Sequence, residues 1–251
     1  PARGELLRPC LGGFNVRRFY QESWQGIPFT SFSHISFFHL AEPKFYAVFY
    51  EELFRRYKNW EDLPSVWREN KRTDAKWLIG QLRAKLAQDP AGRMEPVRVL
   101  SIGSGVGYME KILLEEMPEL ELHVNEPSTV GMKWLREYIP SDRIYIGLPP
   151  MCLPSDVQYD MIYLSTVDYG IPTREFQHLL WELRAQLAPG GELVLLSASL
   201  LEEDSFIGSF VNAIKIGIRA ALHYMGIRRQ QFWGWRRTQD EYRDLFKEAG
   251  F

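Results

Sequence analysis

The feature that most constrains the fold is a glycine-rich loop, Gly-Ser-Gly-Val-Gly at 103–107, placed between two different patterns. The apolar run 97–102 before it predicts a short strand, and residues 106–116 after it predict a helix. Glycines let the backbone turn tightly and approach a ligand closely. Amides at the start of a helix bind polar ligand groups. A strand–loop–helix unit with a ligand site at the loop is therefore expected.

The same alternation of strand and helix continues along the chain. Further strands are predicted at 120–125, 143–146, 159–165 and 192–197, and further helices at 129–138 and 174–187. Strands that alternate with helices indicate a mostly parallel sheet covered by helices on both faces. The predicted fold class is α/β, Rossmann-like and doubly wound, with a helical N-terminal region and an inserted cap.

The flanking segments predict additional helical parts. Aromatic residues at helical spacing predict a helix after Pro43, and a second helix is expected over 74–88, capped by Thr73. A helix is also expected over 205–226. Thr238 and Glu241 then form a capping box that opens a last helix.

These elements suggest a division into four parts: 1–92, a helical cap with a substrate region; 93–200, the core; 201–237, a helical lid; 238–251, a final core helix. The chain starts without Met and ends at Phe251, just after a helix. We therefore expect further residues at both ends, including at least one strand after Phe251.

Composition and charge exclude several classes of protein. The net charge is −2, whereas nucleic-acid binders usually carry a basic excess. Two cysteines cannot build a disulfide framework or a cysteine-rich zinc site. The sequence has no secretory pattern and no apolar run long enough to cross a membrane. A soluble cytoplasmic protein without nucleic acid is expected, and its oligomeric state stays open.

An acidic residue, Glu126, ends the strand after the loop, where a carboxylate can accept hydrogen bonds from ribose hydroxyls. Two ligand classes share this geometry. Dinucleotide-binding loops need a third glycine at position 108, where this chain has Tyr108. The chain instead resembles the class I S-adenosylmethionine-dependent methyltransferases. The resemblance rests on the segments Val-Leu-Ser-Ile-Gly-Ser-Gly-Val-Gly at 99–107, Val-Asn-Glu-Pro-Ser at 124–128, Tyr-Asp-Met-Ile-Tyr-Leu at 159–164 and Leu-Ala-Pro-Gly-Gly-Glu-Leu-Val at 187–194.

The resemblance implies S-adenosylmethionine as cofactor and S-adenosylhomocysteine as product. No metal is expected, because the sequence lacks the clustered acids of magnesium-dependent enzymes and a His pair at metal-ligand spacing. The loop would hold the methionine part, Glu126 the ribose, and the segment around Leu148 would flank the adenine. The implied cofactor residues are Ile102, Gly103, Ser104, Gly105, Gly107, Glu126, Leu148 and Ser165. The end of the strand 159–165 would face the methyl group, which makes Asp168 and Tyr169 the candidate catalytic residues.

Substrate contacts are predicted outside the core. His34 and His39 lie in an aromatic N-terminal segment whose rings either pack a core or line a pocket. The segment 205–239 carries six basic residues: Lys215, Arg219, Arg228, Arg229, Arg236 and Arg237. Arg228, Arg229 and Trp233 are candidate contacts to an anionic group of a small-molecule acceptor. A solvated helix face or contact with an anionic membrane surface are the alternatives.

Three functions remain open from the sequence. The first is in-line methyl transfer from S-adenosylmethionine to a small molecule. The second is a non-catalytic cofactor-binding or scaffold module of the same fold. The third is a dinucleotide-binding oxidoreductase, which Tyr108 disfavours. The strand end Ser-Thr-Val-Asp at 165–168 lacks the Asn/Asp-Pro-Pro-aromatic tetrad of many enzymes that methylate nitrogen in nucleic acids or glutamine.

Overall fold

The computed structural model describes residues 18–21, 23–32, 43–88, 96–201, 214–215, 217–218, 221–222, 225 and 232–251. Its centre is a five-stranded sheet with the strand order β6-β5-β4-β7-β8, in which every neighbouring pair is parallel. The strands are β4 (Arg98–Ile102), β5 (Glu121–Glu126), β6 (Ile144–Ile146), β7 (Tyr159–Ser165) and β8 (Leu187–Leu196). The chain winds outward in both directions from β4, which confirms the predicted doubly wound α/β fold.

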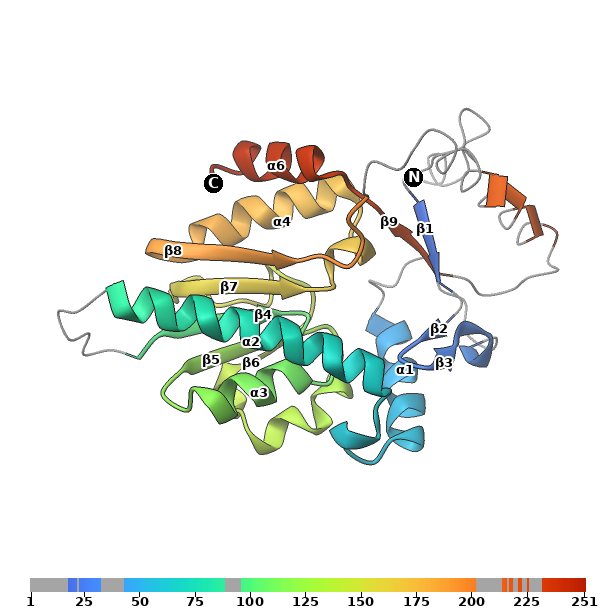
Figure 1. Ribbon diagram of the computed structural model, residues 1–251, viewed down its shortest axis with the longest axis horizontal. Coiled ribbons are helices and arrows are strands. Elements are labelled where there is room, and N and C mark those ends of the chain that lie inside the picture. The colour runs from blue at the N-terminus through green and yellow to red at the C-terminus, as the bar shows by residue number, and fades with distance from the viewer. Residues whose placement is uncertain are drawn as a thin grey trace.

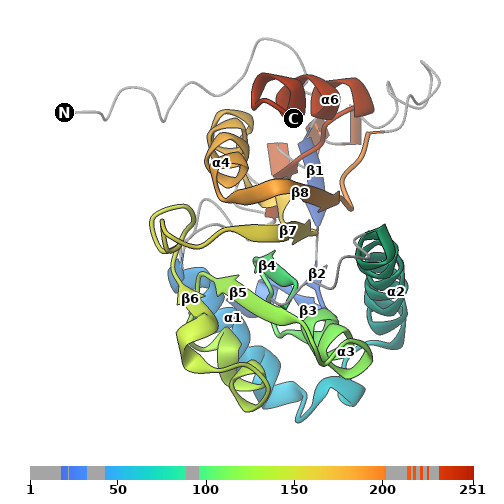
Figure 2. The ribbon, with the colours of Figure 1, turned by 90° about the vertical axis from the view of Figure 1, so that its left-hand side faces the viewer.

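Helices cover both faces of this sheet (Figure 2). On one face lie α2 (Ser65–Gln88) and α3 (Tyr108–Glu116), and buried side chains such as Leu78 and Leu82 join the core beneath them. On the other face lie α4 (Thr173–Ala185) and α6 (Gln239–Glu248), packed through Leu179 and Leu183. The predicted capping box is present at the start of α6, where Thr238 and Glu241 exchange side-chain and backbone hydrogen bonds.

A smaller layer, called the cap layer below, lies at the carboxyl ends of the strands (Figure 1). Its elements are β1 (Arg18–Gln21), β2 (Ser23–Trp24), β3 (Ile27–Pro28), α1 (Pro43–Arg56) and β9 (Phe232–Trp235). β1 pairs antiparallel with β9, so chain segments about 200 residues apart lie side by side. An aromatic cluster that includes Phe45 and Phe49 packs β2, β3 and α1 together.

Short 3-10 turns occupy several connections. They span Phe29–Phe32, Trp60–Asp62, Gly131–Lys133, Leu135–Glu137, Ser141–Arg143 and Asp168–Gly170. The helix predicted over 129–138 was therefore wrong, because two of these turns replace it. A close approach accompanies the change: a Cβ on Gly131 would lie 2.7 Å from the ring of Tyr50 in α1.

Two other boundaries differ from the prediction. α2 starts at Ser65, and Thr73 lies inside it with its hydroxyl donating to the carbonyl of Glu69, so Thr73 is not a cap. β8 already starts at Leu187 and passes through the predicted Pro-Gly-Gly turn with an irregular register. Of the helix predicted over 205–226, most lies outside the described residues, although 214–215, 217–218 and 221–222 are helical.

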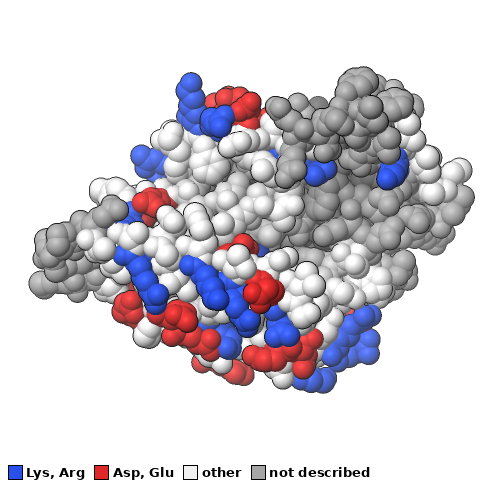
Figure 3. All heavy atoms as spheres, in the orientation of Figure 1, with Lys and Arg blue, Asp and Glu red and all other residues white. Residues whose placement is uncertain are grey.

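The surface and the division into parts bear on function. Figure 3 shows acidic and basic side chains interspersed over the face that carries α2 and α3. Among the described residues, no helix is long and apolar enough to cross a membrane.

α2 packs on α3 and shares its hydrophobic core, although the predicted boundary at 92 would place α2 in the cap. The four-part division stays a prediction.

Candidate functional site

The glycine loop closes the carboxyl end of β4 and leads into α3. Gly105 has a φ of 63°, the left-handed region that favours glycine, and its missing side chain faces a cavity. The nearest atom to an added Cβ there would be the Tyr50 hydroxyl, at 3.6 Å. Gly107 has a φ of 74°, but a Cβ there would lie 2.1 Å from Leu135 Cγ. Gly105 therefore leaves space in the cavity, whereas Gly107 allows Leu135 to pack closely against the loop.

Glu126, the last residue of β5, lies next to this loop and is 2% exposed. Its Oε2 accepts a hydrogen bond from the Gly105 amide at 3.0 Å. Its Oε1 is buried and accepts no hydrogen bond from the described residues. Burial raises the pKa of this carboxyl to about 8, against the opposing effects of the Gly105 amide, the Tyr50 hydroxyl and the Ser128 amide. Within the described part of the chain, an acceptor oxygen is thus held in place without a hydrogen-bond donor.

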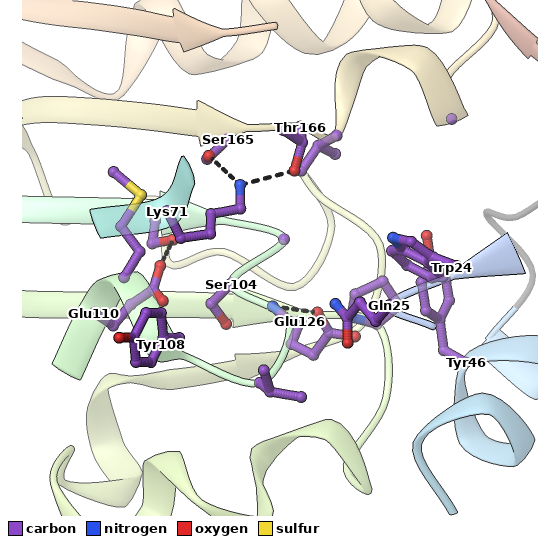
Figure 4. A pocket seen from close by; sticks show the side chains of 18 of the residues that line it. Trp24, Gln25, Tyr46, Lys71, Ser104, Tyr108, Glu110, Glu126, Ser165 and Thr166 are labelled. Carbon is purple, nitrogen blue, oxygen red and sulfur yellow. Dashed lines mark hydrogen bonds between the residues drawn. The ribbon is translucent and has the colours of Figure 1, made fainter. Parts of the chain in front are cut away.

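The cavity lies between the strand ends and the cap layer (Figure 4). Trp24, Gln25, Tyr46 and Tyr50 line it from the cap side. The sequence left open whether such aromatic residues pack a core or line a pocket. The three aromatic residues named here do both: Tyr50 belongs to the buried aromatic cluster, and Trp24 and Tyr46 pack against it. Aromatic residues of this segment thus pack a core and line the cavity as well, while a contact with substrate stays a prediction.

The core side of the cavity is polar at the end of β7. Lys71 of α2 is 8% exposed, and its Nζ donates to Ser165 Oγ at 2.6 Å and to Thr166 Oγ1 at 2.9 Å. Burial lowers the pKa of this ammonium. Thr166 has a φ of 57° and Gln25 a φ of 47°. Both line the cavity, and strained non-glycine backbone of this kind gathers at functional sites.

A second carboxyl, Glu110 of α3, also lines the cavity and is 2% exposed. Its Oε1 accepts hydrogen bonds from Ser101 Oγ at 2.6 Å and from the Tyr163 hydroxyl at 2.7 Å. Its Oε2 is buried and has no hydrogen-bond partner among the described residues. Burial raises its pKa. The cavity therefore presents two carboxyls and one ammonium to a ligand.

The structure brings together most of the residues predicted at the cofactor. Those that line the cavity are Gly103, Ser104, Gly105, Glu126 and Ser165, together with the candidate catalytic residue Tyr169. Ile102 and Gly107 flank the loop without lining the cavity, and Leu148 is 39% exposed and lies outside it. All of these roles stay predictions.

Asp168 is fully buried and is not among the lining residues. Its Oδ2 accepts hydrogen bonds from Ser197 at 2.7 Å, from Ser199 at 3.0 Å and from the Tyr242 hydroxyl. Its carboxylate therefore connects β7 to β8 and α6. Asp168 thus stabilises the turn that carries the neighbouring Tyr169, which does line the cavity.

The predicted substrate residues lie mostly outside the described part of the chain. This holds for His34, His39, Arg228 and Arg229, while Trp233 is described only as part of the backbone of β9. Arg237, counted among the basic residues of the lid, is 2% exposed. Its guanidinium donates to the carbonyls of Asp168 and Ile171 at 2.9 and 2.7 Å. It is thus a buried structural group and presents no charge on a lid.

The sequence interpretation missed Lys71 and Glu110. The pattern that could have identified Lys71 is its spacing, because residues 71, 75, 78 and 82 fall on one face of α2 and the last three are buried and apolar. A single lysine on the apolar face of a helix is unusual. Glu110 follows the same logic in the first turn of α3, where Met109 and Leu113 are buried.

Comparisons with known proteins give a similar fold. No protein-family profile and no curated protein matches the chain. Similar solved structures include the magnesium protoporphyrin IX methyltransferase of Synechocystis PCC 6803 with bound SAH, at 13% identity and a TM-score of 0.47, covering 73% of this chain and 72% of that one. The human N-acetylserotonin methyltransferase in complex with SAM has 18% identity and a TM-score of 0.41, covering 61% and 41%.

The mitomycin 7-O-methyltransferase is similar at 18% identity and a TM-score of 0.42, covering 62% of this chain and 43% of that one. The chain spans about half the length of several solved structures that it matches. At these identities and TM-scores the likenesses concern the fold alone and assign the chain no activity.

Proposed function

We propose that this chain is an S-adenosylmethionine-dependent methyltransferase that acts on a small-molecule acceptor. The observation that carries the proposal is the joint position of Gly105 and Glu126. The loop amide and the carboxylate are hydrogen-bonded, and Glu126 lines the cavity. Its buried Oε1 accepts no hydrogen bond from the described residues, so a ribose hydroxyl could donate to it. The glycine loop supplies the adjoining space for the rest of the cofactor.

The composition of the cavity favours a sulfonium over a pyrophosphate. Glu110 and Glu126 are buried carboxyls that would oppose a doubly charged anion, while a cationic ligand would favour their ionised forms. Trp24, Tyr46 and Tyr169 add aromatic rings, whose faces attract cations. Tyr108 begins α3 at the position where a dinucleotide-binding loop needs glycine.

S-adenosylmethionine, when bound, supplies a methyl group that is already activated for displacement. The protein would then align the acceptor atom with the methyl–sulfur bond and exclude water. Tyr169 is 6% exposed, and burial, with Asp168 nearby, raises the pKa of its hydroxyl. Its neutral phenol suits it to donate a hydrogen bond to an acceptor oxygen, and less to act as a base.

The acceptor would enter between the strand ends and the cap layer. Trp24 and Tyr46 would form its apolar wall, since they line the cavity opposite Lys71 and Glu110 (Figure 4). An enclosed aromatic wall suits a small organic molecule. An anionic acceptor, contacts from His34, His39, Arg228, Arg229 and Trp233, and a cytoplasmic location stay predictions.

A thermal-shift panel tests the cofactor class. S-adenosylhomocysteine should raise the unfolding temperature, because a ligand that binds only the folded state stabilises it. NAD and NADP should have no effect at equal concentration. The opposite pattern would favour the dinucleotide-binding oxidoreductase.

Catalysis needs a separate test, since a scaffold module of the same fold would also bind the cofactor. The protein should be incubated with methyl-labelled S-adenosylmethionine and a mixture of small-molecule extracts. Label transferred to a small molecule supports the enzyme. Cofactor binding without transfer to any fraction would favour the scaffold.

A further inference from the structure

A buried cation, Lys71, lines the cavity. Lys71 is on the apolar face of α2, where its neighbours at helical spacing are Ala75 and Leu78. Its Nζ donates to the hydroxyls of both Ser165 and Thr166 at the end of β7 (Figure 4). Burying an ammonium is costly unless it is paired with an anion.

The described residues compensate this charge through two carboxyls, Asp74 and Glu110, that act on the ammonium from beyond hydrogen-bond distance. Among the described residues, the ion-pair partner of Lys71 is Asp74, with 3.9 Å between Nζ and Oδ2. That distance is too long for a hydrogen bond. The other partners of Nζ are neutral hydroxyls, which are weaker acceptors than a carboxylate. Lys71 lines the cavity, and its ammonium could bind an anion at a shorter distance than Asp74.

We propose that Lys71, Ser165 and Thr166 form a subsite for a carboxylate of a bound ligand. One ammonium and two hydroxyls match a singly charged, planar group, since each can donate to its oxygens. A phosphate dianion would meet Glu110 and Glu126 in the same cavity and would be disfavoured. Glu110 Oε2, which has no hydrogen-bond partner in the described part of the chain, could at the same time accept from a ligand ammonium.

Two sources can supply this carboxylate. One is the amino-acid end of S-adenosylmethionine, and this possibility rests on the proposed function. The other is an acidic group of the acceptor. Both place a carboxylate against Lys71, so the chemistry of the subsite is the same.

Calorimetric titrations distinguish these sources. The ligands are S-adenosylhomocysteine, 5′-methylthioadenosine, which lacks the amino-acid end, and benzoate added to protein saturated with 5′-methylthioadenosine. The variants are Lys71→Met and, as a matched control on the exposed side of α2, Lys76→Met. If the cofactor supplies the carboxylate, Lys71→Met should weaken S-adenosylhomocysteine at least about tenfold and leave 5′-methylthioadenosine unchanged.

If the acceptor supplies it, S-adenosylhomocysteine affinity should be unchanged, and benzoate should bind the parent protein but not Lys71→Met. If Lys71→Met changes the affinity of neither S-adenosylhomocysteine nor benzoate, the proposed subsite is overturned. Ser165→Ala covers the possibility that Lys71→Met disturbs folding. It should weaken the same carboxylate ligand several-fold and spare 5′-methylthioadenosine, and equal losses for both would also overturn the subsite. Failure of the parent protein to bind either nucleoside would refute the proposed function instead, while the benzoate titration, repeated without nucleoside, would still test the subsite.

Discussion

The amide nitrogen of Gly105 lies 3.0 Å from Glu126 Oε2, so the glycine loop after β4 is hydrogen-bonded to the end of the adjacent strand β5. This bond uses one carboxylate oxygen and leaves the buried Oε1 without a partner among the described residues. The two residues are separated by 21 positions in the sequence. Their contact turns a loop and an acid, each common alone, into one binding arrangement.

Replacing Glu126 should weaken cofactor binding. Above its folded-state pKa of about 8 Glu126 is ionised, so the titrations are made at a pH above that value. There Glu126→Gln removes the charge and keeps the size of the side chain. A hydrogen bond to a charged group contributes about 1.5–3 kcal/mol, so affinity for S-adenosylhomocysteine should fall roughly 10- to 150-fold. Calorimetry measures this loss, and Glu119→Gln, at an exposed position, is the control. A loss of less than about threefold would mean that Glu126 does not contact the ribose.

The raised pKa of Glu126 predicts a pH dependence of stability. Its folded-state pKa of about 8 exceeds the ordinary value of 4.5, so the unliganded folded protein binds this proton more tightly than the unfolded chain does. The stabilisation is fully present below pH 4.5 and is lost as pH rises through about 8. Glu110 shifts in the same direction. The difference between the parent protein and Glu126→Gln in unfolding free energy against pH therefore isolates Glu126, and parallel curves would contradict its raised pKa.

Two glycine substitutions should separate packing from binding. Gly107→Ala would place a methyl group against Leu135 at a positive φ, and should lower the free energy of unfolding by about 2–5 kcal/mol. Gly105→Ala meets no close atom and should cost about 1–2 kcal/mol for its backbone conformation. Its main effect should be on S-adenosylhomocysteine affinity. Denaturant unfolding and calorimetry on both variants check this, and equal effects on stability would show that the loop geometry is wrong.

Removing Arg237 should destabilise the protein. Arg237→Met leaves the buried carbonyls of Asp168 and Ile171 without their donors, and each unsatisfied group costs about 1–3 kcal/mol. The adjacent Arg236 is more exposed, and Arg236→Gln should be close to neutral. Chemical denaturation compares the two variants. A neutral Arg237→Met would argue for an exposed position in a basic lid instead.

Local patterns were sufficient to predict the sheet and the loop. The strands are short apolar runs next to turn residues, and β7 starts and ends where the sequence predicted. Glu126 was predictable for the same reason, since the position of an acid at the end of a strand is set by the strand itself. The capping box of α6 depends on two residues three positions apart, which a sequence pattern shows directly.

Contacts between distant residues were not predictable. Lys71 meets Ser165 across 94 positions, and only the packing of α2 against the sheet brings them together. The burial of Arg237 likewise depends on its hydrogen bonds to the carbonyls of Asp168 and Ile171, which lie 69 and 66 positions away in the sequence. The local pattern over 129–138 predicted a helix. It could not show the close approach of Gly131 to Tyr50 of α1, which depends on residues about 80 positions apart.

The central claim is that Gly105 and Glu126 bind the nucleoside of S-adenosylmethionine. Titration calorimetry of S-adenosylhomocysteine into the purified chain tests it most directly. We expect one binding site per chain, a measurable heat, and no competition from NAD added beforehand. Absence of binding to a folded chain, or displacement of S-adenosylhomocysteine by NAD, would contradict the proposed function.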